Sequence, residues 1–148
     1  EISGLWWQDN RLTPREQALK VLTMASIVEK EAKRDQDRAK IASVFVNRLE
    51  KNMPLQSDAT IHYFLDDWSR PLTKKDTQRD SPYNTYKNTG LPPAPICNPG
   101  RKSMVAAMRP EKTDYIFFIS QPDGSIKFTT NHRDHVNLKN EMKRNGDL

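Results

Sequence analysis

Cysteine is nearly absent from this sequence, because Cys97 is the single one among 148 residues. An intrachain disulfide and a metal site built from several cysteines are therefore excluded. No apolar run approaches the roughly 20 residues needed to span a bilayer. The sequence also has no Gly/Ser linker, internal repeat or low-complexity block. A chain of this length and uniform composition is expected to fold as one domain.

The motifs that mark several common enzyme classes are also missing. There is no Gly-x-x-x-x-Gly-Lys-Ser/Thr, no Gly-x-Gly-x-x-Gly and no Gly-x-Ser-x-Gly, which argues against phosphate-loop, dinucleotide-binding and serine-hydrolase chemistry. His132 and His135 have i,i+3 spacing, but neither a His-Glu-x-x-His motif nor a cysteine cluster supplies further ligands. No metal and no cofactor is therefore expected, and either carboxylate chemistry or a binding module remains.

The chain is basic, with 24 Lys plus Arg against 19 Asp plus Glu and a net charge of +5. This charge favours polyanionic partners such as nucleic acid, anionic lipid or an acidic wall polymer. The basic residues are interleaved with acids and have no regular series of aromatic partners, which is typical of solvated faces. Nucleic acid is therefore not the expected partner, and such binding would weaken steeply with salt.

The apolar pattern predicts an α+β fold, a single mixed domain over residues 1–148. Thr13 can cap the first helix and Pro14 fits its first turn. A long proline-rich ordered loop is expected over 81–100. The other expected elements are helices over 37–51, 58–64 and 103–108, a small antiparallel β-hairpin of strands 115–120 and 125–130, and a C-terminal helix over 132–143.

Glu29 and Glu31 lie in the later turns of the first helix, which is apolar around much of its circumference. Met24 and Ile27 form a second flank beside its apolar stripe, which comprises Ala18, Val21, Leu22, Ala25, Val28 and Ala32. Residues two apart on a helix point about 200° from each other, so the two carboxyls cannot jointly flank one bond. Periodicity places Glu29 in the stripe and Glu31 on the flank, and burial could raise the pKa of either. Alternatively, both form ordinary surface ion pairs with nearby basic side chains such as Lys33 and Arg34.

Several other polar and aromatic residues also have two interpretations. Asp58 could act as a helix cap, because its side chain can accept from the first free backbone amides. Four aromatic residues could stack on sugar rings or bases, or could simply anchor the chain; these are Tyr63, Trp68, Tyr83 and Tyr86.

Six sequence blocks occur in a fixed order along the chain: SIVEKE (26–31), SVFVNRL (43–49), MPLQSDAT (53–60), YNTY (83–86), TGLPP (89–93) and NPG (98–100). Taken together, they resemble the YceG-like family of endolytic murein transglycosylases, from about Trp6 to the C-terminal helix. The resemblance implies a catalytic domain over 1–148 that lacks the N-terminal membrane helix and LysM-like part of full-length relatives. The chain is therefore expected to be soluble. Full-length members would be anchored in the bacterial cytoplasmic membrane, with this domain on the extracytoplasmic side.

The resemblance implies cleavage of peptidoglycan between N-acetylmuramic acid and N-acetylglucosamine without water, which leaves 1,6-anhydro-muramyl ends and terminates or trims nascent strands. One carboxyl can serve as general acid and then base if an apolar setting raises its pKa. Matching the SIVEKE block assigns this role to Glu31, with Glu29 as the fallback. The helical pattern alone instead favours Glu29 as the more buried group.

The same resemblance implies a substrate-binding wall. It would comprise Gln56, Ser57, Asp58, Tyr83, Asn84 and Thr85. Arg48 would meet a lactyl or peptide carboxylate, or form a structural ion pair. The implied partners are glycan strands and peptidoglycan synthases, and the membrane is reached only through the missing helix. A lysozyme-type muramidase and a non-catalytic peptidoglycan-binding module are the alternatives.

Overall fold

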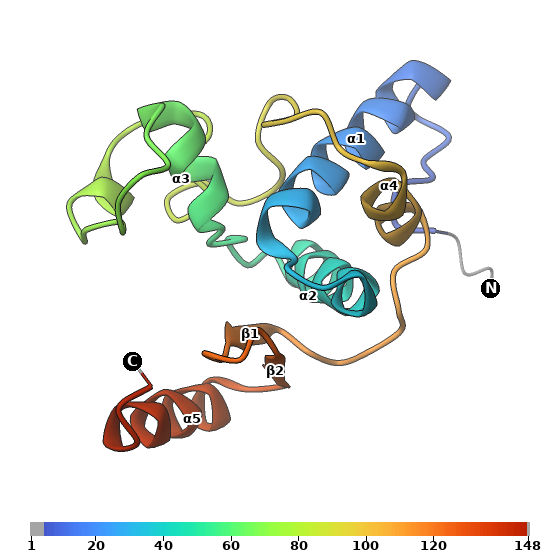
Figure 1. Ribbon diagram of the computed structural model, residues 1–148. Coiled ribbons are helices and arrows are strands. Elements are labelled where there is room, and N and C mark those ends of the chain that lie inside the picture. Colours follow the sequence, from blue (N-terminus) through green and yellow to red (C-terminus); the bar gives the residue numbers. More distant parts are fainter. Residues whose placement is uncertain (1–4, 148) are drawn as a thin grey trace.

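The computed structural model describes residues 5–147, so residues 1–4 and 148 of the expected domain lie outside the described part. The predicted α+β fold is confirmed (Figure 1). Short 3-10 turns at Asp35–Asp37 and Asp76–Gln78 were not predicted. The main elements are α1 (Pro14–Glu31), α2 (Arg38–Glu50), α3 (Asp58–Leu65), α4 (Arg101–Met108), β1 (Phe117–Ser120), β2 (Ile126–Thr129) and α5 (His132–Arg144).

α1 begins where the sequence predicts, because Thr13 and Glu16 cap each other reciprocally. The Glu16 amide donates to Thr13 Oγ1 over 3.1 Å, and the Thr13 amide donates to Glu16 Oε1 over 2.9 Å. Pro14 occupies the first helical position, where a missing N–H has no cost. These contacts satisfy amides that a helix start otherwise leaves unpaired.

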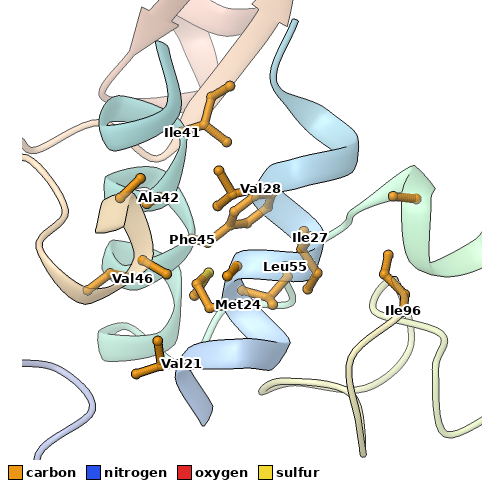
Figure 2. Close-up of a cluster of buried hydrophobic side chains, with 14 residues drawn as sticks. Val21, Met24, Ile27, Val28, Ile41, Ala42, Phe45, Val46, Leu55 and Ile96 are labelled. Carbon is orange, nitrogen blue, oxygen red and sulfur yellow. The ribbon is translucent and has the colours of Figure 1, made fainter. Parts of the chain in front are cut away.

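The core lies where α1, α2 and α4 pack together (Figure 2). Met24, Ile27 and Val28 are fully buried, whereas Leu22 is 36% exposed. The predicted apolar stripe is therefore confirmed at Val21, Ala25 and Val28 but not at Leu22, and the expected flank of Met24 and Ile27 is buried as well. The reason is that α1 packs against α2, α3 and α4 at once, so its buried arc is wider than one stripe.

The predicted hairpin is confirmed. β1 and β2 pair antiparallel from Phe117 opposite Thr129 to Ser120 opposite Ile126. Gly124 has a φ of 89°, which glycine adopts without strain in the turn. Figure 1 shows the hairpin on the side of α2 that faces away from α4, with α5 beyond it. The helical core and this hairpin are joined by aromatic packing, since Phe118 meets Phe45 edge-on with ring centroids 5.8 Å apart.

The segment 81–100 has no helix or strand, as predicted, yet internal hydrogen bonds hold it in place. A single β-bridge joins Thr89, near the middle of this segment, to Pro54. Of the helices in residues 5–147, none combines the length and apolar content that crossing a membrane requires.

Candidate active site

A cleft of about 600 Å³ opens between the packed helices and the C-terminal part of the chain. One side is formed by the end of α1, the segment 53–58 and α2. The other side comes from β1 and α5. Its polar and charged lining residues include Glu31, Arg48, Gln56, Asp58, Tyr86, Ser120, His132, His135 and Lys139. The cleft thus contains four of the residues predicted for the site, from widely separated parts of the sequence.

Glu31, the last residue of α1, reaches this cleft and is held at one carboxylate oxygen. Ser57 Oγ donates to Glu31 Oε2 over 2.7 Å, and the Ala59 amide nitrogen lies 3.5 Å from the same oxygen. Burial raises the pKa of Glu31, and this outweighs the opposing effect of the Ser57 hydrogen bond. The nearby Asp58 charge raises that pKa further. A carboxyl that keeps its proton to higher pH is suited to general-acid chemistry.

Glu29 has the opposite environment. Its Oε1 accepts from the Gly100 amide over 2.9 Å and from Ser103 Oγ over 2.8 Å. Both hydrogen bonds lower the pKa of Glu29, and the bond from Gly100 has the larger effect. The expectation that Glu29 is the more desolvated carboxyl is therefore wrong, because the N-terminus of α4 supplies donors to it. Gly100 allows this approach, since a Cβ there would lie 3.3 Å from Glu29 Oε1.

The predicted ion pairs of these two glutamates do not form. Among the ion pairs of residues 5–147, none includes Glu29 or Glu31. Glu29 instead joins α1 to α4, and Glu31 joins α1 to the start of α3. Each glutamate thus links α1 to another element through hydrogen bonds, and Glu31 is the one that faces the cleft.

Ser57 and Thr85 form a buried network behind Glu31. The Ser57 amide donates to Thr85 Oγ1 over 2.9 Å, and Thr60 Oγ1 donates to the Ser57 carbonyl over 2.8 Å. Thr60 and Thr85 share a further hydroxyl contact of 2.9 Å. Ser57 and Thr85 are 1% and 2% exposed, so they fix the donor to Glu31 and do not line the cleft. The preceding Gln56 has a φ of 53°, rare for a residue with a side chain, and its own side chain is exposed in the cleft.

Asp58 does not cap α3, which corrects that expectation. Ser57 is the N-cap residue, and its side chain makes no capping bond. Asp58 Oδ1 instead accepts from the Tyr86 hydroxyl over 2.5 Å. The pKa of Tyr86 is raised, first by burial and then by the hydrogen bond to Asp58, so the phenol stays protonated and donates. Tyr86 was considered as a residue that stacks on sugar rings but was not assigned to the substrate-binding wall, although the YNTY block contains it.

Tyr83 and Asn84 lie outside the cleft lining. Asn84 is fully buried, and its Nδ2 donates to the Thr77 and Arg79 carbonyls over 3.1 and 2.6 Å. Its Oδ1 accepts from the Tyr86 amide over 2.8 Å. Asn84 therefore shapes the loop that presents Tyr86. Tyr83 packs against Tyr63, with ring centroids 4.9 Å apart.

Arg48 lines the cleft but forms no ion pair with any residue in 5–147, which corrects the predicted structural pair. It is 5% exposed. Its Nε donates to the Ile116 carbonyl over 2.7 Å, and Nη1 donates to the Pro54 carbonyl over 2.8 Å. The guanidinium also lies 4.9 Å from the Phe117 ring centroid. Arg48 thus ties α2 to both sides of the cleft.

His132 and His135, first considered as metal ligands, both line the cleft through α5. His135 stacks on Phe117 with ring centroids 4.6 Å apart, and His132 lies 5.9 Å from the same ring. Within residues 5–147, no three His, Cys, Asp or Glu side chains gather as a metal site would require. The sequence did not predict either histidine as a cleft residue, because Phe117, the ring that both approach, lies on β1 and not on α5.

The sequence of this chain is also similar to those of known proteins. The model of the YceG-like family matches residues 4–141. The chain is 51% identical over 120 residues to the endolytic murein transglycosylase of Bacillus subtilis (strain 168), covering 81% of this chain and 33% of that protein. It is 38% identical over 121 residues to the endolytic murein transglycosylase of Streptococcus pneumoniae (serotype 2, strain D39), covering 78% and 22%. The chain thus spans a third or less of the curated relatives it matches.

A solved structure agrees with the fold. The crystal structure of a putative YceG-like protein from Listeria monocytogenes superposes with a TM-score of 0.80 at 50% sequence identity. The match covers 84% of this chain and 41% of the Listeria chain.

Proposed function

This chain belongs to the YceG-like family, and on that premise we propose that it is the catalytic part of an endolytic murein transglycosylase. Its substrate would be the glycan strand of peptidoglycan, cut between N-acetylmuramic acid and N-acetylglucosamine. The observation that supports this most is Glu31, a cleft carboxyl whose pKa is raised by burial. The relatives from Bacillus and Streptococcus bear the name of this activity.

In the proposed reaction, Glu31 first acts as general acid. Its proton goes to the glycosidic oxygen, and the bond between that oxygen and the muramyl anomeric carbon breaks. The Glu31 carboxylate then takes the proton from the muramyl C6 hydroxyl, whose oxygen attacks the anomeric carbon. The product carries a 1,6-anhydro bond, and Glu31 regains its proton. One carboxyl is thus sufficient, and no water is consumed.

The residues around Glu31 have supporting roles in this proposal. Ser57 donates to one oxygen of Glu31, which fixes the direction of the carboxyl and stabilises its ionised form between the two steps. Asp58 and Tyr86 are bonded to each other in the same cleft. Their pair would stabilise the positive charge that develops on the sugar ring. Gln56, which lines the same cleft, would meet hydroxyl or N-acetyl groups of the strand.

A second candidate function is hydrolysis of the same bond, as in a lysozyme-type muramidase. Asp58 favours it, because this second carboxyl shares the cleft with Glu31. Two carboxyls on one cleft can activate water or form a covalent intermediate. The two reactions differ in their product, since hydrolysis leaves a reducing end.

The proposal extends to location and partners. Murein lies outside the cytoplasmic membrane, so the domain would work on the extracytoplasmic side of that membrane. In the full-length protein an N-terminal helix would anchor it there. Nascent strands would come from glycan-polymerising synthases, which are the proposed protein partners.

The test is mass spectrometry of purified glycan strands after digestion by this protein and by its Glu31→Gln and Glu29→Gln variants. The proposal predicts anhydro-muramyl ends from the unchanged protein and from Glu29→Gln, and none from Glu31→Gln. Reducing ends would establish the hydrolase. Loss of product only with Glu29→Gln would transfer the acid role to Glu29, and strand binding with no product would indicate a binding module.

A further inference from the structure

Both sides of the cleft contribute to a group of basic side chains. We call this group the basic wall; it consists of Arg48 from α2 and His132, His135 and Lys139 from α5. These groups are close enough to affect one another, because Lys139, His132 and Arg48 each lower the pKa of His135, after the larger effect of burial. Phe117 lies among them, with Arg48 4.9 Å and His135 4.6 Å from its ring centroid.

No acid of residues 5–147 neutralises this wall. None of its four side chains takes part in an ion pair within that range. The neighbouring Asp134 is engaged elsewhere, since Asn131 Nδ2 donates to its Oδ2 over 3.0 Å and both residues line a separate hollow. The Arg48 and Lys139 charges therefore have no ion-pair partner within residues 5–147.

Two polar groups of the wall also have spare hydrogen-bonding capacity. Arg48 is 5% exposed and uses Nε and Nη1 for backbone carbonyls. Within the described chain, no hydrogen bond uses its Nη2, and none uses the buried Nδ1 of His135. A guanidinium removed from water without a carboxylate partner carries a desolvation cost that a bound anion offsets. A carboxylate is the anion whose two oxygens match the guanidinium fork.

From this arrangement we infer that the basic wall is a subsite for carboxylate groups carried by the muramyl residues of the glycan strand. The inference rests on the proposed function. Two sources have this chemistry: the free lactyl carboxylate of strands stripped of peptide, and the carboxylates of intact stem peptides. The wall would hold the substituent while the strand passes Glu31 in the same cleft.

The acidic residues of the cleft favour a glycan strand over a nucleic acid as the ligand. Glu31 and Asp58 line the same space of about 600 Å³. A continuous chain of phosphates would meet both carboxyls as well as the basic wall. A glycan strand is neutral along its backbone and carries charge only on its substituents, so it can contact the acidic residues with sugar and the basic wall with carboxylate.

The experiment measures binding in the Glu31→Gln background, so that no strand is cut. The probes are stripped strands with free lactyl carboxylates, the same strands methyl-esterified, and strands with intact stem peptides. His132→Gln combined with Lys139→Gln removes the lysine charge and one imidazole from the part of the wall that α5 contributes. Lys143→Gln is the control, because this exposed lysine lies on the same helix but does not line the cleft.

We expect the Glu31→Gln protein to bind at least one carboxylate-bearing strand about fivefold more tightly than the esterified strand, and the double change to abolish this difference. Lys143→Gln should leave it intact. The strand whose binding weakens identifies the carboxylate source. Equal binding of acidic and esterified strands would overturn the inference, as would equal weakening of both by the double change. Tighter binding of a single-stranded DNA oligonucleotide than of any glycan strand would also overturn it.

A cleavage assay with the unchanged protein distinguishes failure of this inference from failure of the proposed function. Production of anhydro ends with no preference for acidic strands would refute the subsite and leave the transglycosylase standing. A wall-dependent preference in binding, with no cleavage of any strand, would support the subsite and refute the activity.

Discussion

Glu29 and Glu31, two residues apart at the end of α1, have pKa values shifted in opposite directions. Glu29 accepts a backbone amide and a hydroxyl at the start of α4, and its pKa is lowered. Glu31 is desolvated beside Ser57 in the cleft, and its pKa is raised. The helix turns the two carboxyls toward different neighbours, so one is a structural anion and the other a candidate acid.

Glu31→Gln is expected to lower kcat on glycan strands by about 10²- to 10⁴-fold, the usual contribution of a general acid–base group. The amide keeps the shape of the side chain but can neither give nor accept the required proton. Initial rates of anhydro-end formation measure the effect. Glu29→Gln is the matched control two residues away, and an equal loss there would contradict the assignment.

The stability of the same Glu31→Gln variant should exceed that of the unchanged protein at pH 7. The pKa of Glu31 is raised above the ordinary value of 4.5 by burial. The ionised form is therefore disfavoured in the folded state, and Glu31 reduces stability progressively as pH rises from about 4.5 through its folded pKa. Urea unfolding at pH 4 and pH 7 checks this: the difference between the two proteins should be larger at pH 7. A stability gap that stays constant between these pH values would contradict it.

Glu29→Ala should destabilise the fold by about 1 kcal/mol, because Ser103 is fully buried and would lose its acceptor. Glu29→Gln retains an acceptor oxygen and should cost less. Since the pKa of Glu29 is lowered, its stabilising contribution is present above about pH 4.5 and is lost as pH falls through the folded pKa. Thermal unfolding of both variants at pH 7 and pH 3 provides the measurement. A cost for Glu29→Ala that is unchanged at pH 3 would mean that the hydrogen bonds of the ionised carboxylate are not its source.

Ser57→Ala should move the pH–rate profile. Ser57 Oγ donates to the ionised carboxylate and thereby opposes the rise in the pKa of Glu31. Without it, Glu31 should keep its proton to higher pH, so the descending limb of kcat/KM should shift upward. A lower rate with an unmoved limb would show that Ser57 acts through packing alone.

Tyr86→Phe removes the donor to Asp58 without changing the ring. We expect a threefold to tenfold loss in kcat, the value of about 0.5–1.5 kcal/mol for one hydrogen bond. Steady-state kinetics on glycan strands measure the change. Tyr63→Phe is the control, since Tyr63 does not line the cleft; equal losses in the two variants would argue against a role for the pair with Asp58.

Local patterns predicted the elements of this fold better than the contacts among them. Thr13 and Pro14 marked the start of α1 correctly, and the strands expected over 115–120 and 125–130 marked the hairpin, because both signals act within a few residues. The Glu29–Gly100 bond joins residues 71 apart, and the Asp58–Tyr86 bond joins residues 28 apart. Periodicity contains no information on which element supplies such a partner. The burial of Asn84 likewise depends on carbonyls of the preceding turn, so its loop-shaping role became visible only in the structure.

The proposed acid belongs to a helix of the core, whereas the facing wall is contributed by β1 and α5, which follow it by more than eighty positions in the sequence. If both proposals hold, the proton chemistry depends on α1, and most of the carboxylate subsite depends on α5. Exchanging the segment 117–144 between relatives should transfer preference for strand substituents while leaving the proton affinity of Glu31 in place. In that case evolution can change the substrate preference through the C-terminal segment without changing Glu31.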